Sequence, residues 1–260
     1  MTQGAGTQIL TVTELGVRFG GVVALDGTSF SIGRGEICGL IGPNGAGKTT
    51  LFNVVSRLYE PTSGQVSFEG TDLLKLAPHD IASAGIARTF QNLALFPALS
   101  VLDNVMVGAH HATRANFLTG ALRLPGVGRE ERRTRERCRE LLDRLELTQH
   151  ASSPAAGLPY GTLKRVEIAR ALAGDPRLLL LDEPASGLTH AEVDELGDVI
   201  LQLRTDFDLT ILLVEHHMSL VMRVSDQVVA LDLGRKIAEG TPAEVAGDPA
   251  VVEAYLGGVA

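Results

Sequence analysis

The sequence predicts an α/β fold in which a largely parallel sheet is covered by helices on both faces. Apolar segments of strand character at residues 178–181, 210–214 and 227–231 are separated by segments with helical periodicity at 191–204 and 218–224. Strands that alternate with helices favour parallel pairing, because each connection has to cross back over the sheet. At 260 residues, the chain is also long enough to bury a full core.

The first part of the chain predicts more strands and a glycine-rich turn. Segments with β character lie at residues 9–15 and 22–32, and an apolar strand is expected at 36–41. That strand leads directly into the glycine-rich turn, after which a helix is expected at 50–57. The order of strand, loop and helix is the one found where phosphate groups bind.

The middle of the chain changes to helical patterns. Helices are expected at residues 101–109, 129–147 and 163–173, with a loop containing glycine and proline at 120–128. We expect residues 92–160, approximately, to form a helical subdomain inserted into the α/β core of a single domain that spans residues 1–260.

Charge and cysteine content limit the class of partner and the compartment. The formal net charge is −8, which gives no overall attraction to nucleic acid, so no nucleic-acid partner is expected. Arginines are dense at 129–139, but glutamates alternate with them, and we interpret this segment as a solvated helix face rather than a polyanion site. Only Cys38 and Cys138 are present, which fits a reducing cytoplasm without disulfides. Neither a leader-like start nor an apolar run of about 18 residues occurs, so we expect any membrane contact to be made through a partner.

A phosphate-binding loop is the strongest motif of the sequence. It fits the pattern G-x-x-x-x-G-K-[ST] between a predicted strand and a predicted helix. Glycines allow the backbone to wrap around phosphate oxygens, and the N-terminus of the helix adds partial positive charge. Lys48 is expected to bridge the β- and γ-phosphates, and the Thr49 hydroxyl to ligate Mg²⁺. The nucleotide-binding residues expected here are Gly42, Pro43, Asn44, Gly45, Ala46, Gly47, Lys48, Thr49 and Thr50.

Two carboxylates follow the apolar strand at 178–181. The carboxyl ends of strands in open α/β sheets lie beside the ligand crevice, so Asp182 and Glu183 are expected there. Asp182 can hold Mg²⁺, and Glu183 can act as the general base toward an attacking water.

With these motifs in order, the sequence resembles the ATP-binding subunits of ABC transporters over nearly its whole length. Gln91 resembles the Q-loop glutamine, and residues 158–162 stand in the place of the signature motif. His216 resembles the switch histidine that senses the γ-phosphate, and residues 185–189 resemble the D-loop. Phe19 resembles the aromatic residue that stacks on adenine, although an isolated aromatic is more often part of a core.

The resemblance implies a P-loop NTPase core of ABC type, with an N-terminal antiparallel β subdomain and an inserted helical subdomain. It implies an ATPase with ATP and Mg²⁺ as cofactors. Catalysis would fall to Glu183, His216 and Lys48, and metal binding to Thr49, Gln91 and Asp182. A second subunit would bind the same ATP through Pro159, Tyr160, Gly161 and Thr162.

Looser patterns narrow the resemblance to the ATPases of branched-chain amino-acid importers. They lie at residues 18–24, 86–92, 108–111 and 214–216, with Phe117 and residues 124–125 in addition. The resemblance implies import of branched-chain or other hydrophobic amino acids. Its implied partners are a homo- or heterodimeric ATPase pair, permease subunits in the membrane and a periplasmic or extracellular solute-binding protein. The chain would be cytoplasmic, peripheral on the inner face of the cell membrane through the permease.

The sequence departs from the family pattern in two places. Pro159 stands where the signature serine would bond the γ-phosphate of the opposite subunit, and proline also lacks an N–H. Thr162 and Thr189 replace the usual glutamine of the signature and aspartate of the D-loop.

Other functions and a metal site remain as alternatives. They are an export ATPase such as that of lipopolysaccharide transport, a soluble ABC ATPase of translation or repair, and a non-catalytic ATP-binding module. His216 and His217 suggest a metal pair, but adjacent residues at a strand end are expected to point to opposite faces, which argues against one.

Overall fold

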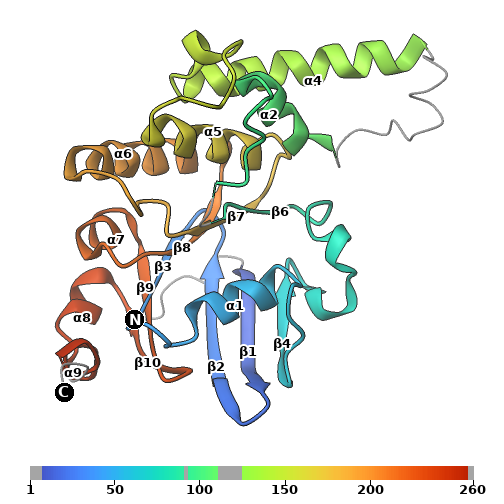
Figure 1. Cartoon of the computed structure of the whole chain (residues 1–260). Coiled ribbons are helices and arrows are strands. Elements are labelled where there is room, and N and C mark those ends of the chain that lie inside the picture. Colours follow the sequence, from blue (N-terminus) through green and yellow to red (C-terminus); the bar gives the residue numbers. More distant parts are fainter. Residues whose placement is uncertain (1–7, 91–92, 111–124, 257–260) are drawn as a thin grey trace. The chain divides into compact units, whose positions relative to one another are not determined.

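The computed structural model describes residues 8–90, 93–110 and 125–256, which divide into two compact units. The first unit holds the residues up to Ile81 and those from Arg177 onward, and the second runs from Ala82 to Pro176. Figure 1 follows the chain through both units in colour.

An antiparallel sheet forms one layer of the first unit. Its strands are ordered β2-β1-β4-β5, and every neighbouring pair is antiparallel. This confirms the N-terminal antiparallel β subdomain, although β1 and β2 are longer than predicted and β4 and β5 were not anticipated. The strand bounds are β1 Gln8–Phe19, β2 Val22–Gly33, β4 Ser63–Phe68 and β5 Thr71–Asp72.

A second, mixed sheet carries the core of the first unit in the order β10-β9-β3-β8-β7. All of its neighbouring pairs are parallel except β9 with β10. Every residue of β3, β7 and β8 is buried, as expected for strands covered on both faces. The bounds are β3 Ile37–Ile41, β7 Leu178–Asp182, β8 Thr210–Val214, β9 Gln227–Asp232 and β10 Arg235–Gly240. The parallel core was predicted, with β8 to the residue, whereas the antiparallel edge strand β10 was not.

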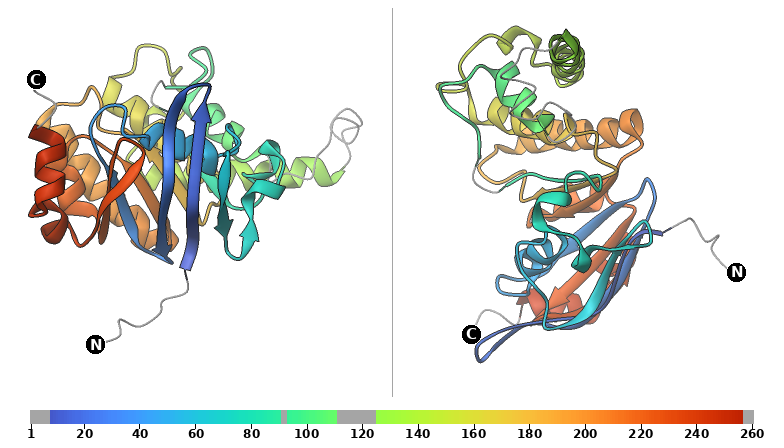
Figure 2. Two further views of the ribbon diagram at one scale, coloured as in Figure 1. Left: turned by 90° about the horizontal axis from the view of Figure 1, so that it is seen from below. Right: turned by 90° about the vertical axis from the view of Figure 1, so that its right-hand side faces the viewer.

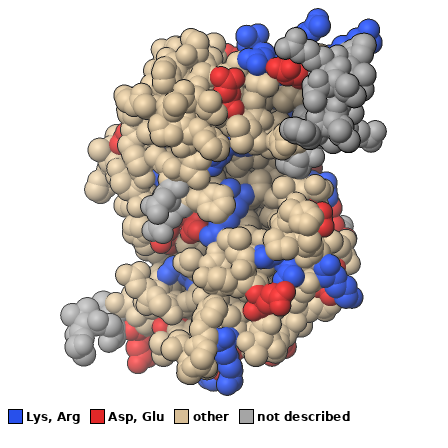
Figure 3. Space-filling model, turned by 45° about the vertical axis from the view of Figure 1, so that its right-hand side comes forward, with Lys and Arg blue, Asp and Glu red and all other residues tan. Residues whose placement is uncertain are grey.

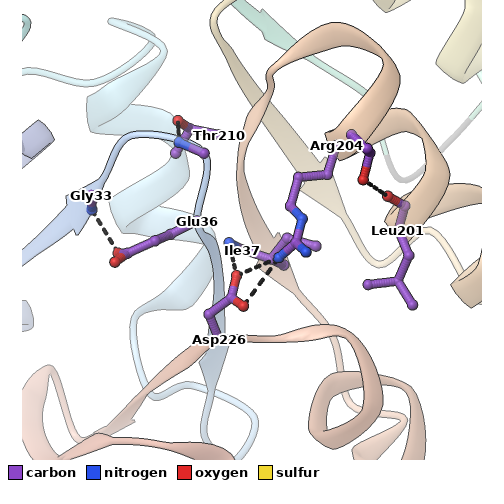
Figure 4. A network of polar contacts seen from close by, with 9 residues as sticks. Gly33, Glu36, Ile37, Leu201, Arg204, Thr210 and Asp226 are labelled. Atoms are coloured by element: carbon purple, nitrogen blue, oxygen red, sulfur yellow. Dashed lines mark hydrogen bonds and ion pairs between the residues drawn. The ribbon is translucent and has the colours of Figure 1, made fainter. Parts of the chain in front are cut away.

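Polar contacts fix the amino end of β3 (Figure 4). The N–H of Ile37 donates to the Asp226 carboxylate at 2.9 Å, and Arg204 donates to both oxygens of that carboxylate. The N–H of Gly35 donates to the Thr210 hydroxyl at the start of β8. These contacts fix the start of β3 and therefore also the position in the sheet at which its carboxyl end lies.

Five helices accompany these sheets among the described residues of the first unit. Helix α1 directly follows β3, and β2 of the antiparallel sheet contacts both α1 and β10, as the two views of Figure 2 help to follow. Helices α7, α8 and α9 contribute Val221, Val245 and Val251 to a buried cluster against β3 and β9. The bounds are α1 Lys48–Val55, α6 His190–Phe207, α7 Met218–Val224, α8 Pro242–Ala246 and α9 Pro249–Leu256.

The second unit is mainly helical among its described residues. It contains β6 Ile86–Arg88, α2 Val101–Gly108, α4 Pro125–Arg144 and α5 Tyr160–Leu172. Helices α2 and α5 pack closely, because a Cβ on Gly108 would lie 1.8 Å from the carbonyl oxygen of Arg170. The predicted loop at 120–128 is wrong from Pro125 onward, where α4 begins. Proline fits the first turn of a helix, since its missing N–H has no partner there anyway.

Short 3₁₀ turns at Leu73–Lys75, Pro78–Asp80 and Thr148–His150 complete the described elements. Across the described ranges, no helix has both the length and the apolar character needed to cross a membrane. Basic and acidic side chains lie interspersed on the face shown in Figure 3. Arg135 and Glu131 of α4, for example, are 3.5 Å apart, as in an i,i+4 ion pair.

Candidate active site

The carboxyl ends of three strands meet at one edge of the mixed sheet. Leu40 of β3 pairs with Val214 of β8, and Val214 pairs with Asp182 of β7. The glycine-rich loop after β3, the carboxylates after β7 and the histidines after β8 therefore leave the sheet at the same level. This is the edge at which open α/β sheets bind ligands.

The loop after β3 needs glycine at two positions for steric reasons. Gly42 has φ of 149°, and a Cβ there would lie 2.1 Å from the carbonyl oxygen of Leu231. Gly47 has φ of 101° and caps the N-terminus of α1, and a Cβ there would lie 2.5 Å from the carbonyl oxygen of Ala24. The loop thus turns tightly against neighbouring backbone and presents the start of α1. Thr49 is exposed and Thr50 half-buried in the first turn of that helix.

Lys48 folds back over the loop. Its ammonium group donates to the carbonyl oxygens of Gly42 at 2.6 Å and Pro43 at 2.9 Å. Burial lowers the pKa of Lys48, and the negative charge of Glu183 opposes that shift. The charges of Lys48 and Glu183 therefore interact, as expected for two residues of one site.

Asp182 and Glu183 end β7 in different conformations. Asp182 is the last residue of the strand and is buried, whereas Glu183 is half-buried in the left-handed region with φ of 46°. The Glu183 N–H donates to the carbonyl oxygen of Val214 at 2.9 Å, which anchors it beside β8. A left-handed backbone is unfavourable for a residue with a side chain and is concentrated at functional sites.

Glu215 joins the segments after β7 and β8, and this role was not anticipated from the sequence. Its buried carboxylate accepts hydrogen bonds from the backbone N–H groups of Ala185 at 2.7 Å, His216 at 2.9 Å and His217 at 3.1 Å. A glutamate directly after the apolar run at 211–214 is a signal that could have indicated it, because such a residue must find partners if it is buried.

The two histidines are oriented differently from the expectation. Their ring centroids are 4.7 Å apart with an interplanar angle of 36°, so they lie side by side and do not point to opposite faces. The prediction failed because the strand ends at Val214, after which the alternation of a strand no longer applies. His216, Glu215 and His217 could be grouped around a metal ion. Because the carboxylate already accepts three N–H groups, we interpret Glu215 as a brace.

Phe19, the expected adenine-stacking residue, is the last residue of β1 and is exposed. Its ring makes an edge contact with Tyr59, with ring centroids 5.2 Å apart. The contact leaves a substantial part of the Phe19 ring accessible, at 47% for the residue as a whole. Phe19 is thus not a core residue.

The residues expected to act in a second subunit lie at the start of α5. Pro159 is the N-cap, with no hydrogen bond from its side chain to the helix, and Tyr160, Gly161 and Thr162 form the first turn. Helix α5 thus begins three residues earlier than predicted, and the segment presents a helix N-terminus. Further along α5, the Glu167 carboxylate accepts a hydrogen bond from the N–H of Phe90, the residue before Gln91. Gln91 itself lies outside the described residues, as does Phe117.

Thr189 has a clear structural role at the start of α6. Its hydroxyl accepts from the Glu192 N–H at 3.4 Å, and the Thr189 N–H donates to the Glu192 carboxylate at 2.8 Å. This reciprocal pair is a capping box, which satisfies the first N–H groups of the helix. The threonine found in place of the expected aspartate therefore fixes where α6 begins.

Fold and site together define an α/β protein with a phosphate-binding loop. Residues 25–186 match the family described as ABC transporter, and residues 235–260 match the family described as branched-chain amino acid ATP-binding cassette transporter. The chain belongs to the ABC transporter ATP-binding family, whose members are ATPases.

Curated relatives are similar in sequence to this chain over almost its entire length. The high-affinity branched-chain amino acid transport ATP-binding protein BraF of Pseudomonas aeruginosa is 41% identical, covering 96% of this chain and 98% of the relative. The corresponding protein LivG of Escherichia coli K12 is 40% identical over the same shares. Among solved structures, the ADP conformation of an ATP-binding cassette of an ABC transporter has a TM-score of 0.84. It is 32% identical and covers 96% of this chain and 99% of that chain.

Proposed function

We propose that this protein hydrolyses ATP at the edge of the mixed sheet and thereby powers import of branched-chain or other hydrophobic amino acids through a separate permease. The observation that carries the proposal is that the phosphate loop, Asp182–Glu183 and His216 leave adjacent strands at one level. A ligand bound at this edge would be approached by a cation, two carboxylates and an imidazole.

The donor set fits a Mg²⁺-nucleotide. Phe19 offers an accessible ring to adenine, the loop 42–47 and the start of α1 offer N–H groups to phosphates, and Lys48 offers a positive charge. Thr49, Asp182 and Gln91 would hold a Mg²⁺ ion, which would neutralise phosphate charge. Lys48 donates to carbonyl oxygens of the loop, which holds its ammonium group where a γ-phosphate could accept from it.

Hydrolysis then needs a positioned water. Its oxygen attacks the γ-phosphorus, and the bond from that phosphorus to the β–γ bridging oxygen breaks with its electron pair leaving on ADP. The Glu183 carboxylate accepts the proton that the water loses, so the products are ADP and inorganic phosphate. His216 contacts the γ-phosphate. Glu215 positions His216 by accepting a hydrogen bond from the backbone N–H of His216.

The functional form in this proposal is a head-to-tail dimer. Each ATP lies between the phosphate loop of one subunit and the Pro159–Thr162 segment of the other. The N-terminus of α5 supports this, because Pro159 supplies no capping side chain and the helix end attracts an anion. ATP favours the closed dimer by its differential affinity, and hydrolysis releases it. Residues 92–160, approximately, form the inserted helical subdomain that faces the permease.

The substrate class is inferred from the relatives' descriptions, and the partners from the resemblance to importer ATPases. BraF and LivG are described as ATP-binding proteins of high-affinity branched-chain amino acid transport, and the match at 235–260 is to a family described as branched-chain amino acid ATP-binding cassette transporter. We infer a homo- or heterodimer of ATPase subunits, two permease chains and an external solute-binding protein. The chain would work in the cytoplasm on the inner face of the cell membrane, held there by the permease.

The test uses the transporter assembled from this chain and the membrane chains that co-purify with it from native membranes, with the external solute-binding protein supplied. In vesicles loaded with ATP, labelled leucine should accumulate. With Lys48→Ala, both ATP turnover and uptake should be lost, while circular dichroism of the variant stays unchanged. ATP turnover that persists in a folded Lys48→Ala chain contradicts the site, and turnover without uptake of any branched-chain or other hydrophobic amino acid contradicts the substrate.

A further inference from the structure

The C-terminal helix touches the first residue of the phosphate loop. The N–H of Gly42 donates a 2.8 Å hydrogen bond to the hydroxyl oxygen of Tyr255, a residue 213 positions away in the sequence. Burial raises the pKa of the Tyr255 hydroxyl, and the bond from Gly42 opposes that rise. The phenol is therefore neutral under physiological conditions and accepts this bond through a lone pair of its oxygen.

The same helix also packs against the residue before the loop. Val251 of α9 lies in the buried cluster that contains Ile41, the last residue of β3. Val251 and Tyr255 are four residues apart, so they share one face of α9. One face of the helix thus holds two consecutive residues, Ile41 by packing and Gly42 by a hydrogen bond.

The hairpin between β9 and β10 braces the other end of the loop. The N–H of Gly234 donates to the carbonyl oxygen of Ala46 at 3.1 Å. The Gly234 carbonyl oxygen in turn accepts from the Thr28 hydroxyl at 2.8 Å and from the Asp26 N–H at 2.9 Å. The chain from β9 to the end of α9 therefore contacts the phosphate loop at both its entry and its exit.

We propose that Tyr255 is a positioning residue for nucleotide binding and that α9 acts as a clamp on the entry of the phosphate loop. The hydroxyl holds the Gly42 amide, and through it the path of the loop, in the conformation that phosphates require. This inference rests on the proposed nucleotide site and adds a role for the C-terminal segment. By linkage, nucleotide bound in the loop also stabilises the docked position of α9.

The test compares Tyr255→Phe with Val252→Ala in the full chain. Tyr255→Phe keeps the ring and removes only the hydroxyl. Val252 is an exposed residue of the same helix and serves as the matched control. Three quantities are measured: the dissociation constant of a fluorescent ATP analogue, the KM and kcat of ATP hydrolysis, and the midpoint of thermal unfolding without nucleotide.

Tyr255→Phe should weaken nucleotide affinity and raise KM by about two- to tenfold, the scale of one net hydrogen bond, with kcat at saturating ATP unchanged. Val252→Ala should change neither quantity. A second measurement follows hydrogen exchange of residues 249–256, which ATP should slow in the unaltered chain and slow less in Tyr255→Phe.

Two outcomes overturn the clamp. One is a dissociation constant for Tyr255→Phe equal to that of the unaltered chain. The other is an equal loss of affinity in Val252→Ala, which would assign the effect to the general stability of α9. These outcomes differ from failure of the proposed function, in which the unaltered chain itself would not bind the analogue.

Discussion

The backbone N–H of Ala185 donates a 2.7 Å hydrogen bond to the buried carboxylate of Glu215. Ala185 lies two residues after Glu183 in the segment that follows β7, and Glu215 is the first residue after β8. The same carboxylate accepts from the N–H groups of His216 and His217. One side chain therefore sets the relative positions of the segments that carry Glu183 and His216.

Glu215→Ala should destabilise the protein and lower its ATP turnover. The substitution leaves the N–H groups of Ala185, His216 and His217 without their charged acceptor, and a hydrogen bond to a charged group contributes about 1.5–3 kcal/mol. We expect a decrease in the free energy of unfolding on that order, measured by urea denaturation, and a decrease in kcat because His216 loses its position. Glu215→Gln, which retains a carbonyl oxygen, should be affected less.

The matched control for this prediction is Glu60→Ala, because the Glu60 side chain is 86% exposed. It should leave both the free energy of unfolding and kcat nearly unchanged. If Glu215→Ala behaves like Glu60→Ala, then Glu215 does not brace the site.

Glu183→Gln should retain ATP binding and lose turnover. The amide has the size of the carboxylate but does not accept the proton of the attacking water, and a positioned general base contributes about 10²- to 10⁴-fold. Phosphate release should therefore fall by at least about 10²-fold, while the dissociation constant of ATP changes little. Near-normal phosphate release by the folded variant would remove Glu183 from the role of general base.

The capping box at α6 predicts a dependence of stability on pH. The hydrogen bonds from the Thr189 backbone N–H and side chain hold the pKa of Glu192 below its ordinary value. A carboxylate with a lowered pKa in the folded state contributes stability above its ordinary pKa of about 4.3, and that contribution is lost as the pH falls through the folded pKa.

Thr189→Ala should therefore reduce the free energy of unfolding by about 1 kcal/mol at pH 7, the usual effect of losing an N-cap hydroxyl. The difference from the unaltered chain should shrink as the pH falls below the ordinary pKa of about 4.3 and then through the lowered folded pKa of Glu192, below which the carboxyl is protonated in both states. Denaturation curves at pH 3.5, 5 and 7 measure it. Thr205→Ala, an exposed change near the end of the same helix, serves as the control and should show no such trend. If the difference in the free energy of unfolding between Thr189→Ala and the unaltered chain stays constant from pH 7 to 3.5, Glu192 does not contribute through the cap.

Local sequence predicted the parts of the fold and site that depend on neighbouring residues. The phosphate loop follows from the glycine spacing, and β8 and α7 were predicted to the residue because apolar runs and turn residues mark their ends. Contacts between distant segments could not be read in this way. Tyr255 and Gly42 are 213 residues apart, and nothing in the motif around Gly42 indicates a tyrosine partner.

The end of β8 shows why orientation was harder to predict than location. His216 was placed at the correct edge of the sheet, but its relation to His217 was inferred from the alternation of a strand. Strand β8 ends at Val214, and the backbone N–H groups of both histidines donate to the Glu215 carboxylate instead of to a neighbouring strand. The deciding interaction is a buried carboxylate with backbone partners, and single-residue patterns carry no information about it.

The last prediction concerns Pro159, the N-cap of α5, in the proposed dimer. A serine there would gain a hydroxyl that can bond the γ-phosphate of the opposite subunit, and a hydrogen bond to a charged group contributes about 1.5–3 kcal/mol. It would lose the rigidity of proline, which contributes about 0.4–1 kcal/mol at a compatible site. Pro159→Ser in a Glu183→Gln background should therefore lower the ATP concentration needed for dimerisation, by roughly tenfold, measured by sedimentation.

The structure adds a competing effect, because serine at an N-cap also bonds the first turn of its own helix. Pro159→Asp in the same background separates the two contributions. Aspartate caps a helix as well as serine does, but its charge repels a phosphate, so it should stabilise α5 and raise the ATP requirement. If Ser and Asp shift dimerisation equally in the favourable direction, the effect comes from capping within one subunit. If Ser alone does so, the hydroxyl acts across the dimer, as the proposed arrangement requires.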